Sequence, residues 1–286
     1  MTAVTSSRWF VQLQGHPFDL GHLALHLLGP DLTVCRDERG SDHLLYSSSF
    51  TDDLSSEQIA ERANQFAVLL SGALTVIRTG SEPVRVGAVY RTNDAGGRDV
   101  FVRLNESISV RAEVGAVVVS ATDSEGVPVA VTQPPSRTQQ LIQLAAADPA
   151  IAKVLRLVVG YDAKLWVGLY RIYEVIEADV GGQSALVATA WGSESDLRRF
   201  KHSANSVAAA GDAARHGREV TQPPRNPMTL PEGEAYVSYL VQAWLASKGG
   251  KRPATTILTA RAGLVQRQPA LSFQRCGSSS STRLAG

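Results

Sequence analysis

The chain has 286 residues, of which 44% are hydrophobic and 19% charged, with a formal net charge of +1. These values are ordinary for a globular protein, and no apolar run approaches the ~20 residues of a membrane-spanning helix. The N-terminal sequence lacks the basic start and apolar core of a signal peptide, so we expect a cytoplasmic protein. The two cysteines, Cys35 and Cys276, are far apart in sequence and predict neither a disulfide framework nor a cysteine zinc site.

The first 133 residues are dominated by short segments rich in β-branched and aromatic residues, with turn signals such as NDAGGRD and TDSEG between several of them. These segments predict strands at 8–14, 32–36, 43–50, 73–78, 84–92, 99–105, 108–114 and 116–122. One helix interrupts them, with a capping box from Ser55 to Gln58 and a glycine stop at Gly72. The pattern predicts an α+β unit in which the helix packs on an antiparallel sheet.

A second helix is predicted in DLGHLALHLLG, where Leu20, Leu23 and Leu27 form an apolar stripe. His22 and His26 are four residues apart and would project from one face, as metal ligands can. The glutamate that completes a zincin helix is absent. We therefore expect a solvated or partly packed histidine pair and no metal or cofactor, with a metal site as the alternative.

At QPPS, residues 133–136, the alternating segments give way to helical periods, and we place a domain boundary there. A capping box at Ser136 to Gln139 and the pair Asp148 and Pro149 predict two short helices or one kinked helix. Further along, a helix is predicted up to Gly181 and Gly182, with Arg171 and Glu174 as an i, i+3 ion pair. Its aromatic residues are expected in the core, although a base-stacking platform is the alternative; they are Trp166, Tyr170 and Tyr173.

The stretch RRFKHSANSVAAAGDAARHG, residues 198–217, places many polar groups among alanines, serines and glycines. Ser193 and Asp196 predict the start of a helix that carries His202 and reaches Asn205. The small residues that follow favour close approach of a second helix, which would bring His202, Asn205 and His216 together. The alternative is a purely structural role. Asp212, Arg215 and Arg218 would then form exposed ion pairs, and His216 would cap a helix before Gly217.

A last helix is predicted from the capping box at Thr229 to Glu232 up to Gly249, with an apolar face of Val237, Leu240, Val241, Trp244 and Leu245. Beyond it, the chain carries six basic residues, no acid and a serine run, a composition typical of disorder. The predicted fold class is therefore α+β. It comprises a mixed domain at 1–133 that could sense a ligand or bind a partner, an all-α helical bundle at 136–248 and a low-complexity basic tail at 249–286.

An all-α C-terminal unit with Asn205 followed by GDAARHG resembles the higher eukaryote and prokaryote nucleotide-binding (HEPN-like) superfamily over about 110 residues. The resemblance implies a four-helix core, homodimers through the helical domain, and RNA or a nucleotide as partner. For a metal-independent ribonuclease it implies His216 as general base or acid and Arg215 as phosphate clamp. Asn205 and Asp212 would be orienting groups, and His202 a second proton donor.

Three function classes follow from these patterns. The first is an RNA-cleaving or nucleotide-binding effector, and the second a non-catalytic regulatory or protein-binding module that uses the same polar helix surface. The third is a metal-dependent hydrolase that uses His22 and His26. The sequence has no Walker loop, no GxGxxG between a strand and a helix and no GxSxG elbow, so it offers no motif for nucleotide triphosphatases, Rossmann oxidoreductases or α/β-hydrolases.

Overall fold

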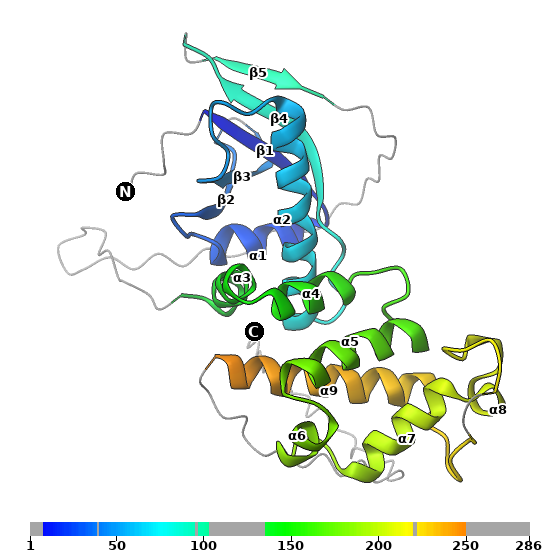
Figure 1. Ribbon diagram of the computed structural model, residues 1–286. Coiled ribbons are helices and arrows are strands. Elements are labelled where there is room, and N and C mark those ends of the chain that lie inside the picture. The colour runs from blue at the N-terminus through cyan, green and yellow to red at the C-terminus, as the bar shows by residue number, and fades with distance from the viewer. Residues whose placement is uncertain (1–7, 39, 95–96, 103–134, 220–221, 250–286) are drawn as a thin grey trace, which may run out of the picture. The chain divides into compact units, whose positions relative to one another are not determined.

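The computed structural model describes residues 8–38, 40–94, 97–102, 135–219 and 222–249. The described residues up to 102 contain five strands and two helices, which are labelled in Figure 1. The strands are β1 (Trp9–Gln14), β2 (Leu32–Arg36), β3 (His43–Ser47), β4 (Arg85–Thr92) and β5 (Arg98–Phe101), and the helices are α1 (Pro17–His26) and α2 (Ser56–Ile77).

From residue 135 onward, the described residues fold into helices and connecting loops. These elements are α3 (Arg137–Ala147), α4 (Pro149–Leu157), α5 (Trp166–Asp179), α6 (Gln183–Ala188), α7 (Glu194–Asn205), α8 (Val207–Ala210), the short 3₁₀ turn η1 (Gly211–Ala213) and α9 (Leu230–Lys248). The predicted α+β class is confirmed: an antiparallel sheet with two helices is followed by a helical region.

The strands form one antiparallel sheet in the order β2-β3-β1-β4-β5. β4 and β5 make the hairpin that NDAGGRD predicted, closed by a bond from the Asn93 amide to the Gly97 carbonyl at 3.0 Å. Five of the predicted strands are thereby found, with small differences at their ends. The strands predicted at 108–114 and 116–122, like the tail beyond 249, lie outside the described residues.

One face of the sheet supplies the core. Alternate side chains of β1 belong to the buried cluster that also contains residues of α1 and α2. Val11 is fully buried there, in register with Leu45 and Val89 on the two neighbouring strands. Figure 1 shows α2 running alongside the strands. On α1, Leu20, Leu23 and Leu27 are buried, so the predicted apolar stripe is confirmed.

The opposite face of the sheet carries a row of stacked rings. Phe10 lies between Tyr46 and Tyr90, with both pairs of ring centroids 5.3 Å apart and nearly parallel. Arg98 lies over the Phe10 ring at 4.9 Å and donates two hydrogen bonds to Asp37, at 2.6 and 3.0 Å. Burial raises the pKa of the Tyr46 hydroxyl to about 12 and also raises the pKa of the Tyr90 hydroxyl.

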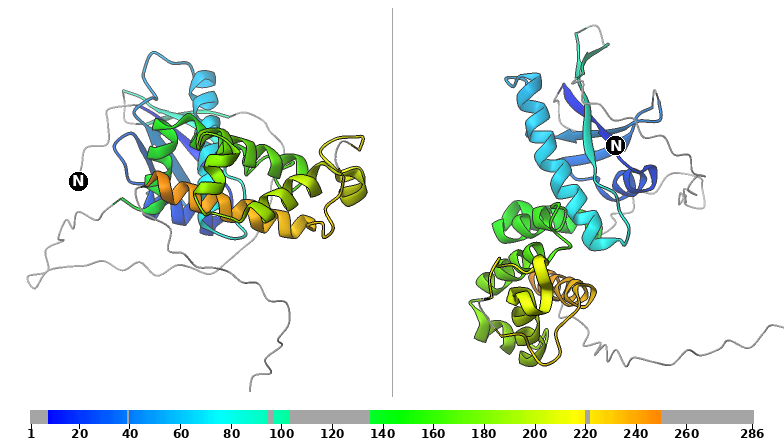
Figure 2. Two further views of the ribbon diagram at one scale, coloured as in Figure 1. Left: turned by 60° about the horizontal axis from the view of Figure 1, so that its bottom comes forward. Right: turned by 90° about the vertical axis from the view of Figure 1, so that its right-hand side faces the viewer.

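Two predictions for α2 are wrong. Gly72 does not end the helix, and the strand predicted at 73–78 is the last part of α2 up to its C-cap, Arg78. Gly72 is buried where α2 meets α4, and a Cβ atom there would overlap with the carbonyl group of Leu155. Figure 2 shows α4 beside the C-terminal half of α2. The glycine therefore permits close helix packing, and this packing outweighs the strand propensity of the β-branched residues that follow.

Side-chain caps begin most of the helices where the sequence predicted them. Ser55 and Thr229 form complete capping boxes with Gln58 and Glu232. Single side-chain caps come from Ser136, Asp148 and Ser193. Gly181 and Gly182 follow the end of α5 with positive φ angles, and α9 ends before Gly249, as expected.

The aromatic residues of α5 are in the core, which confirms that prediction. Phe200 of α7 has no exposed surface and lies at the centre of a ring cluster with four neighbours at centroid distances of 5.4 to 6.0 Å. These neighbours are Trp166, Tyr170, Tyr173 and Tyr236. The predicted apolar face of α9 is buried beside α5.

Lys248, at the end of α9, forms hydrogen bonds with residues at the ends of α4 and α5. Its ammonium group donates to Asp148, the N-cap of α4, at 2.8 Å and to Asp179, at the end of α5, at 2.9 Å. Burial lowers the pKa of Lys248, but the two carboxylates outweigh that effect and raise it overall. Trp244 donates to the same Asp179 carboxylate at 2.8 Å, so the network fixes three helix ends together.

All described residues belong to one compact unit, Met1–Pro253. Its buried apolar side chains form a continuous cluster that includes both α2 and the helices after residue 136. The predicted boundary at 133–136 thus falls between segments that pack on each other, and independent folding of 136–248 stays a prediction. Among the described residues, no helix is long and apolar enough to cross a membrane.

Candidate functional site

Arg215, the predicted phosphate clamp, is held by two residues of α5. Its Nη2 donates to Oε1 of Glu174 at 2.8 Å, and its guanidinium carbon lies 4.1 Å from the centre of the Tyr170 ring. Its main-chain amide donates to the carbonyl of Ala204 near the end of α7, also at 2.8 Å. Arg215 therefore links the loop after η1 to both α5 and α7.

The other four predicted site residues have separate surroundings. Nδ1 of His202 lies 3.2 Å from the carbonyl oxygen of Gln222, and the amide of Asn205 donates to a carbonyl of its own helix at 2.8 Å. Oδ1 of Asn205 is buried without a hydrogen-bond partner. Asp212 is exposed and His216 half-buried. Across the part of the chain that the structure describes, no hydrogen bond or ion pair joins any two of the five side chains.

The predicted helix pair at 198–217 is not formed, and that prediction is wrong. After α7 the chain makes only the four-residue α8, because Ser206 caps its start and Gly211, with a φ of 59°, ends it. At the end of α7, a small residue instead allows the chain that follows to pack against the helix. Ser203 is buried, and its hydroxyl accepts the Met228 amide at 2.8 Å, so the returning chain lies directly against the helix.

The prediction of an ion pair between Arg171 and Glu174 is also wrong. Arg171 donates to Asp162, in the loop before α5, at 2.6 Å, while Glu174 pairs with Arg215. The Asp162 side chain is only 9% exposed, so its charge needs a close partner. Tertiary contacts thus replace the local pairing that sequence spacing suggested.

The basic residues of α7 and the following chain up to Met228 fall into two groups. The segment 197–228 contains six arginines and lysines and two acids. Three of the basic residues pair with acids of other helices, namely Arg199 with Glu232, Lys201 with Glu177 and Arg215 with Glu174. The other three, Arg198, Arg218 and Arg225, are exposed and form no ion pair with a described residue.

Arg198 is on α7, and the other two exposed arginines lie in segments of the chain that contact α7 or α8. The chain from Gln222 to Met228 lies along the helix, because Arg199 donates to the carbonyls of Asn226 and Pro227 at 2.6 and 3.1 Å. Arg225 is thus next in the chain to a residue bound by Arg199, the neighbour of Arg198 on α7. Glu219 accepts the Ala208 amide at 2.8 Å, which holds the loop around Arg218 to α8.

His22 and His26 form the partly packed pair that the sequence predicted. Their rings are 4.4 Å apart, and Nε2 of His22 lies 3.0 Å from the hydroxyl of Thr138 at the start of α3. The pKa of His22 is lowered, mainly by burial and to a smaller extent by the charges of His26 and Arg78. The charge of Asp19 raises the pKa but only partly offsets these effects. Among the described residues, no three histidine, cysteine or acidic side chains group as metal ligands would.

The lowered pKa of His22 predicts a loss of stability in mild acid. Because the folded protein binds this proton less readily than the unfolded chain, its stability is full above a pH of about 6.5 and falls as the pH drops toward the lower folded pKa. In urea unfolding at about pH 7.5 and 5.5, His22→Gln should lose less stability on acidification than the wild type. His216→Gln is the control. If the His22 variant kept the full pH dependence, this prediction would fail.

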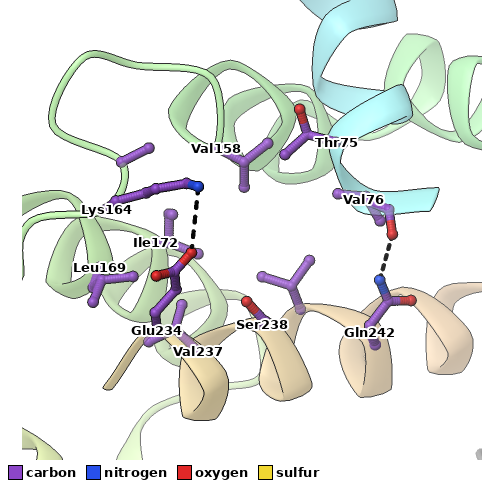
Figure 3. A pocket seen from close by; sticks show the side chains of 12 residues that line it. Thr75, Val76, Val158, Lys164, Leu169, Ile172, Glu234, Val237, Ser238 and Gln242 are labelled. Atoms are coloured by element: carbon purple, nitrogen blue, oxygen red, sulfur yellow. Dashed lines mark hydrogen bonds and ion pairs between the residues drawn. The ribbon is translucent and has the colours of Figure 1, made fainter. Parts of the chain in front are cut away.

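Sequence reasoning did not find a cavity of about 110 Å³ where the end of α2 meets α5, α9 and the loop before α5 (Figure 3). Its apolar wall consists of Val76, Val158, Ala163, Leu169, Ile172, Val237 and Val241. Nζ of Lys164 lies 3.7 Å from Oε1 of Glu234 at one side, and Gln242 donates to the Val76 carbonyl at 2.6 Å at the other. Helical periodicity marked several of these positions as apolar but could not show that three helices leave a space between them.

No protein-family model, curated protein or solved structure matches this chain.

Proposed function

We propose that this protein is a non-catalytic binding module that recognises single-stranded RNA through the arginine surface of Arg198, Arg218 and Arg225. The observation that carries the proposal is the division of the basic residues along 197–228. Three are neutralised by acids of neighbouring helices, whereas these three are exposed and in no described ion pair. Exposed guanidinium groups are well suited to phosphate oxygens, because they present several donors in one plane.

The same contacts support binding without cleavage. A phosphate clamp needs a guanidinium that is available to the ligand, and Arg215 is already bound to Glu174 and stacked on Tyr170. A general base needs a group that orients its ring, and His216 has no hydrogen bond with a described side chain. The pair that the HEPN-like resemblance implies is therefore not preassembled. The relationship to that superfamily, and dimers through the helical part, stay predictions.

RNA affinity tests the proposal directly. Binding of a labelled single-stranded RNA would be measured over a range of salt concentrations for the wild type and for the triple variant Arg198→Gln, Arg218→Gln, Arg225→Gln. Each phosphate contact to a single strand contributes about −0.7 to the slope of log affinity against log salt. Loss of three contacts should flatten that slope by about two and weaken binding to all RNA sequences alike.

The matched control removes three exposed arginines elsewhere, as Arg36→Gln, Arg85→Gln, Arg156→Gln, with the same change in net charge. It should bind nearly as the wild type does. Equal weakening by both triple variants would show that binding follows net charge alone, and absence of wild-type binding would remove the RNA proposal.

The catalytic alternative has its own experiment. Wild-type protein and His216→Ala would be incubated with RNA in the presence of EDTA, and the products separated by size. We expect intact RNA in both samples. Cleavage by the wild type that disappears in His216→Ala would establish a metal-independent ribonuclease and overturn the non-catalytic part of the proposal.

A further inference from the structure

The cavity between α2, α5 and α9 has the size of a small ligand. Its volume of about 110 Å³ is of the same order as the ~150 Å³ apolar cavity that holds benzene in another protein. Aliphatic side chains from three helices line it, among them Val76, Ile172 and Val241 (Figure 3). A compact apolar group therefore fits, and a nucleotide or an extended lipid chain does not.

The two charged residues at its rim are held unequally. The Lys164 side chain is 81% exposed and comes from the loop before α5, whereas Glu234 is 42% exposed and belongs to α9. Their charged atoms are 3.7 Å apart, which is too long for a hydrogen bond. Such an exposed ion pair contributes little, so Lys164 can leave with little loss. Glu234 stays at the rim, and no described residue donates a hydrogen bond to its carboxylate.

Ser238 adds an acceptor beside this carboxylate. It lies one helical turn after Glu234 on the side of α9 that lines the cavity, and its hydroxyl makes no hydrogen bond with a described residue. A carboxylate and a hydroxyl next to an aliphatic cavity can together receive an ammonium group, which has three donors.

We propose that this cavity binds a small primary amine with a compact apolar body, of the size of an arylalkylamine. The ammonium of the ligand takes the place of Lys164, donates to Glu234 and Ser238, and leaves its apolar body against the aliphatic wall. This site does not depend on the arginine surface, because none of its lining residues belongs to α7 or to the loop after it. A bound amine contacts α2, α5 and α9 at once and so stabilises their packing.

Three probes of similar shape and different charge test the site on the full chain. Benzylamine, benzyl alcohol and phenylacetate would be titrated separately, and dissociation constants taken from saturable changes in the amide NMR spectrum. Benzylamine should bind most tightly and also raise the melting temperature. Equal affinity for benzylamine and benzyl alcohol, or tighter binding of phenylacetate, would overturn the proposal.

Variants of the two charged residues separate the ligand's charge from its shape. Glu234→Gln should weaken benzylamine binding roughly two- to fivefold and leave benzyl alcohol unchanged, because the interaction of the ammonium with a partly exposed carboxylate is lost. Lys164→Met should strengthen benzylamine binding roughly two- to fivefold by removing the competing cation. Lys153→Met, an exposed lysine of α4, is its matched control and should have no effect.

The cavity itself is tested by filling it. Val241→Phe should abolish binding of benzylamine and benzyl alcohol alike, with a melting curve that shows the variant is folded. Undiminished benzylamine binding to folded Val241→Phe, or to Glu234→Gln, would place the amine elsewhere on the protein and contradict the proposal.

Discussion

Gly72→Ala is expected to lower the free energy of unfolding by about 3 kcal/mol, although alanine is the better helix former. Gly72 lies inside α2, and a Cβ atom there would overlap with the carbonyl group of Leu155 in α4. Leu155 is fully buried, so its main chain cannot move away without disturbing the core. The two helices must separate, and the contacts between α2 and α4 are weakened.

Gly21→Ala provides the matched control, because Gly21 is also inside a helix. No atom lies within 4 Å of the position that its Cβ would take, so only helix propensity changes. Alanine there should raise the free energy of unfolding by about 0.5 to 1 kcal/mol. Urea unfolding of both variants at one pH measures the contrast. A Gly72 variant as stable as the wild type would show that α2 and α4 do not pack as closely as described.

Phe200→Ala is expected to lower the free energy of unfolding by about 4 kcal/mol. Phe200 is fully buried, and its ring contacts four aromatic rings from α5 and α9. Removing it loses the burial of one large apolar side chain and leaves a cavity that rigid neighbouring rings cannot fill. Both effects add to the loss.

The control for Phe200 is Phe18→Ala on α1. Phe18 is 60% exposed, and Arg78 over its ring at 4.2 Å is the one aromatic or cationic contact described for it. Its removal should change the free energy of unfolding by about 1 kcal/mol or less. Thermal or urea unfolding distinguishes the two variants. Similar small losses for both would mean that the ring cluster does not carry the stability of the helical part.

The sequence by itself determined where most elements begin and which side chains are buried. A capping box such as Ser55 to Gln58 is a local arrangement within four residues, so its residues alone specify it. Apolar spacing is local in the same sense, and it identified the buried stripes of α1 and α9. Alternation and turn signals are also local, and they identified the five strands. The order β2-β3-β1-β4-β5 depends instead on pairings such as β1 with β4, between segments far apart in sequence.

Contacts between residues far apart in sequence were decided only by the tertiary structure. From the sequence, Gly72 predicts the end of a helix. The structure shows that Gly72 packs against Leu155 inside α2, and this close packing outweighs the strand propensity of the residues that follow. Arg215 is predicted as a phosphate clamp, and only the tertiary structure shows that its guanidinium contacts Glu174 and Tyr170, about forty residues earlier. Lys164 and Glu234 meet beside a cavity that exists because three helices fail to fill the space between them. Periodicity reports which side of a helix is apolar, but ion pairs and cavities depend on which other element that side faces.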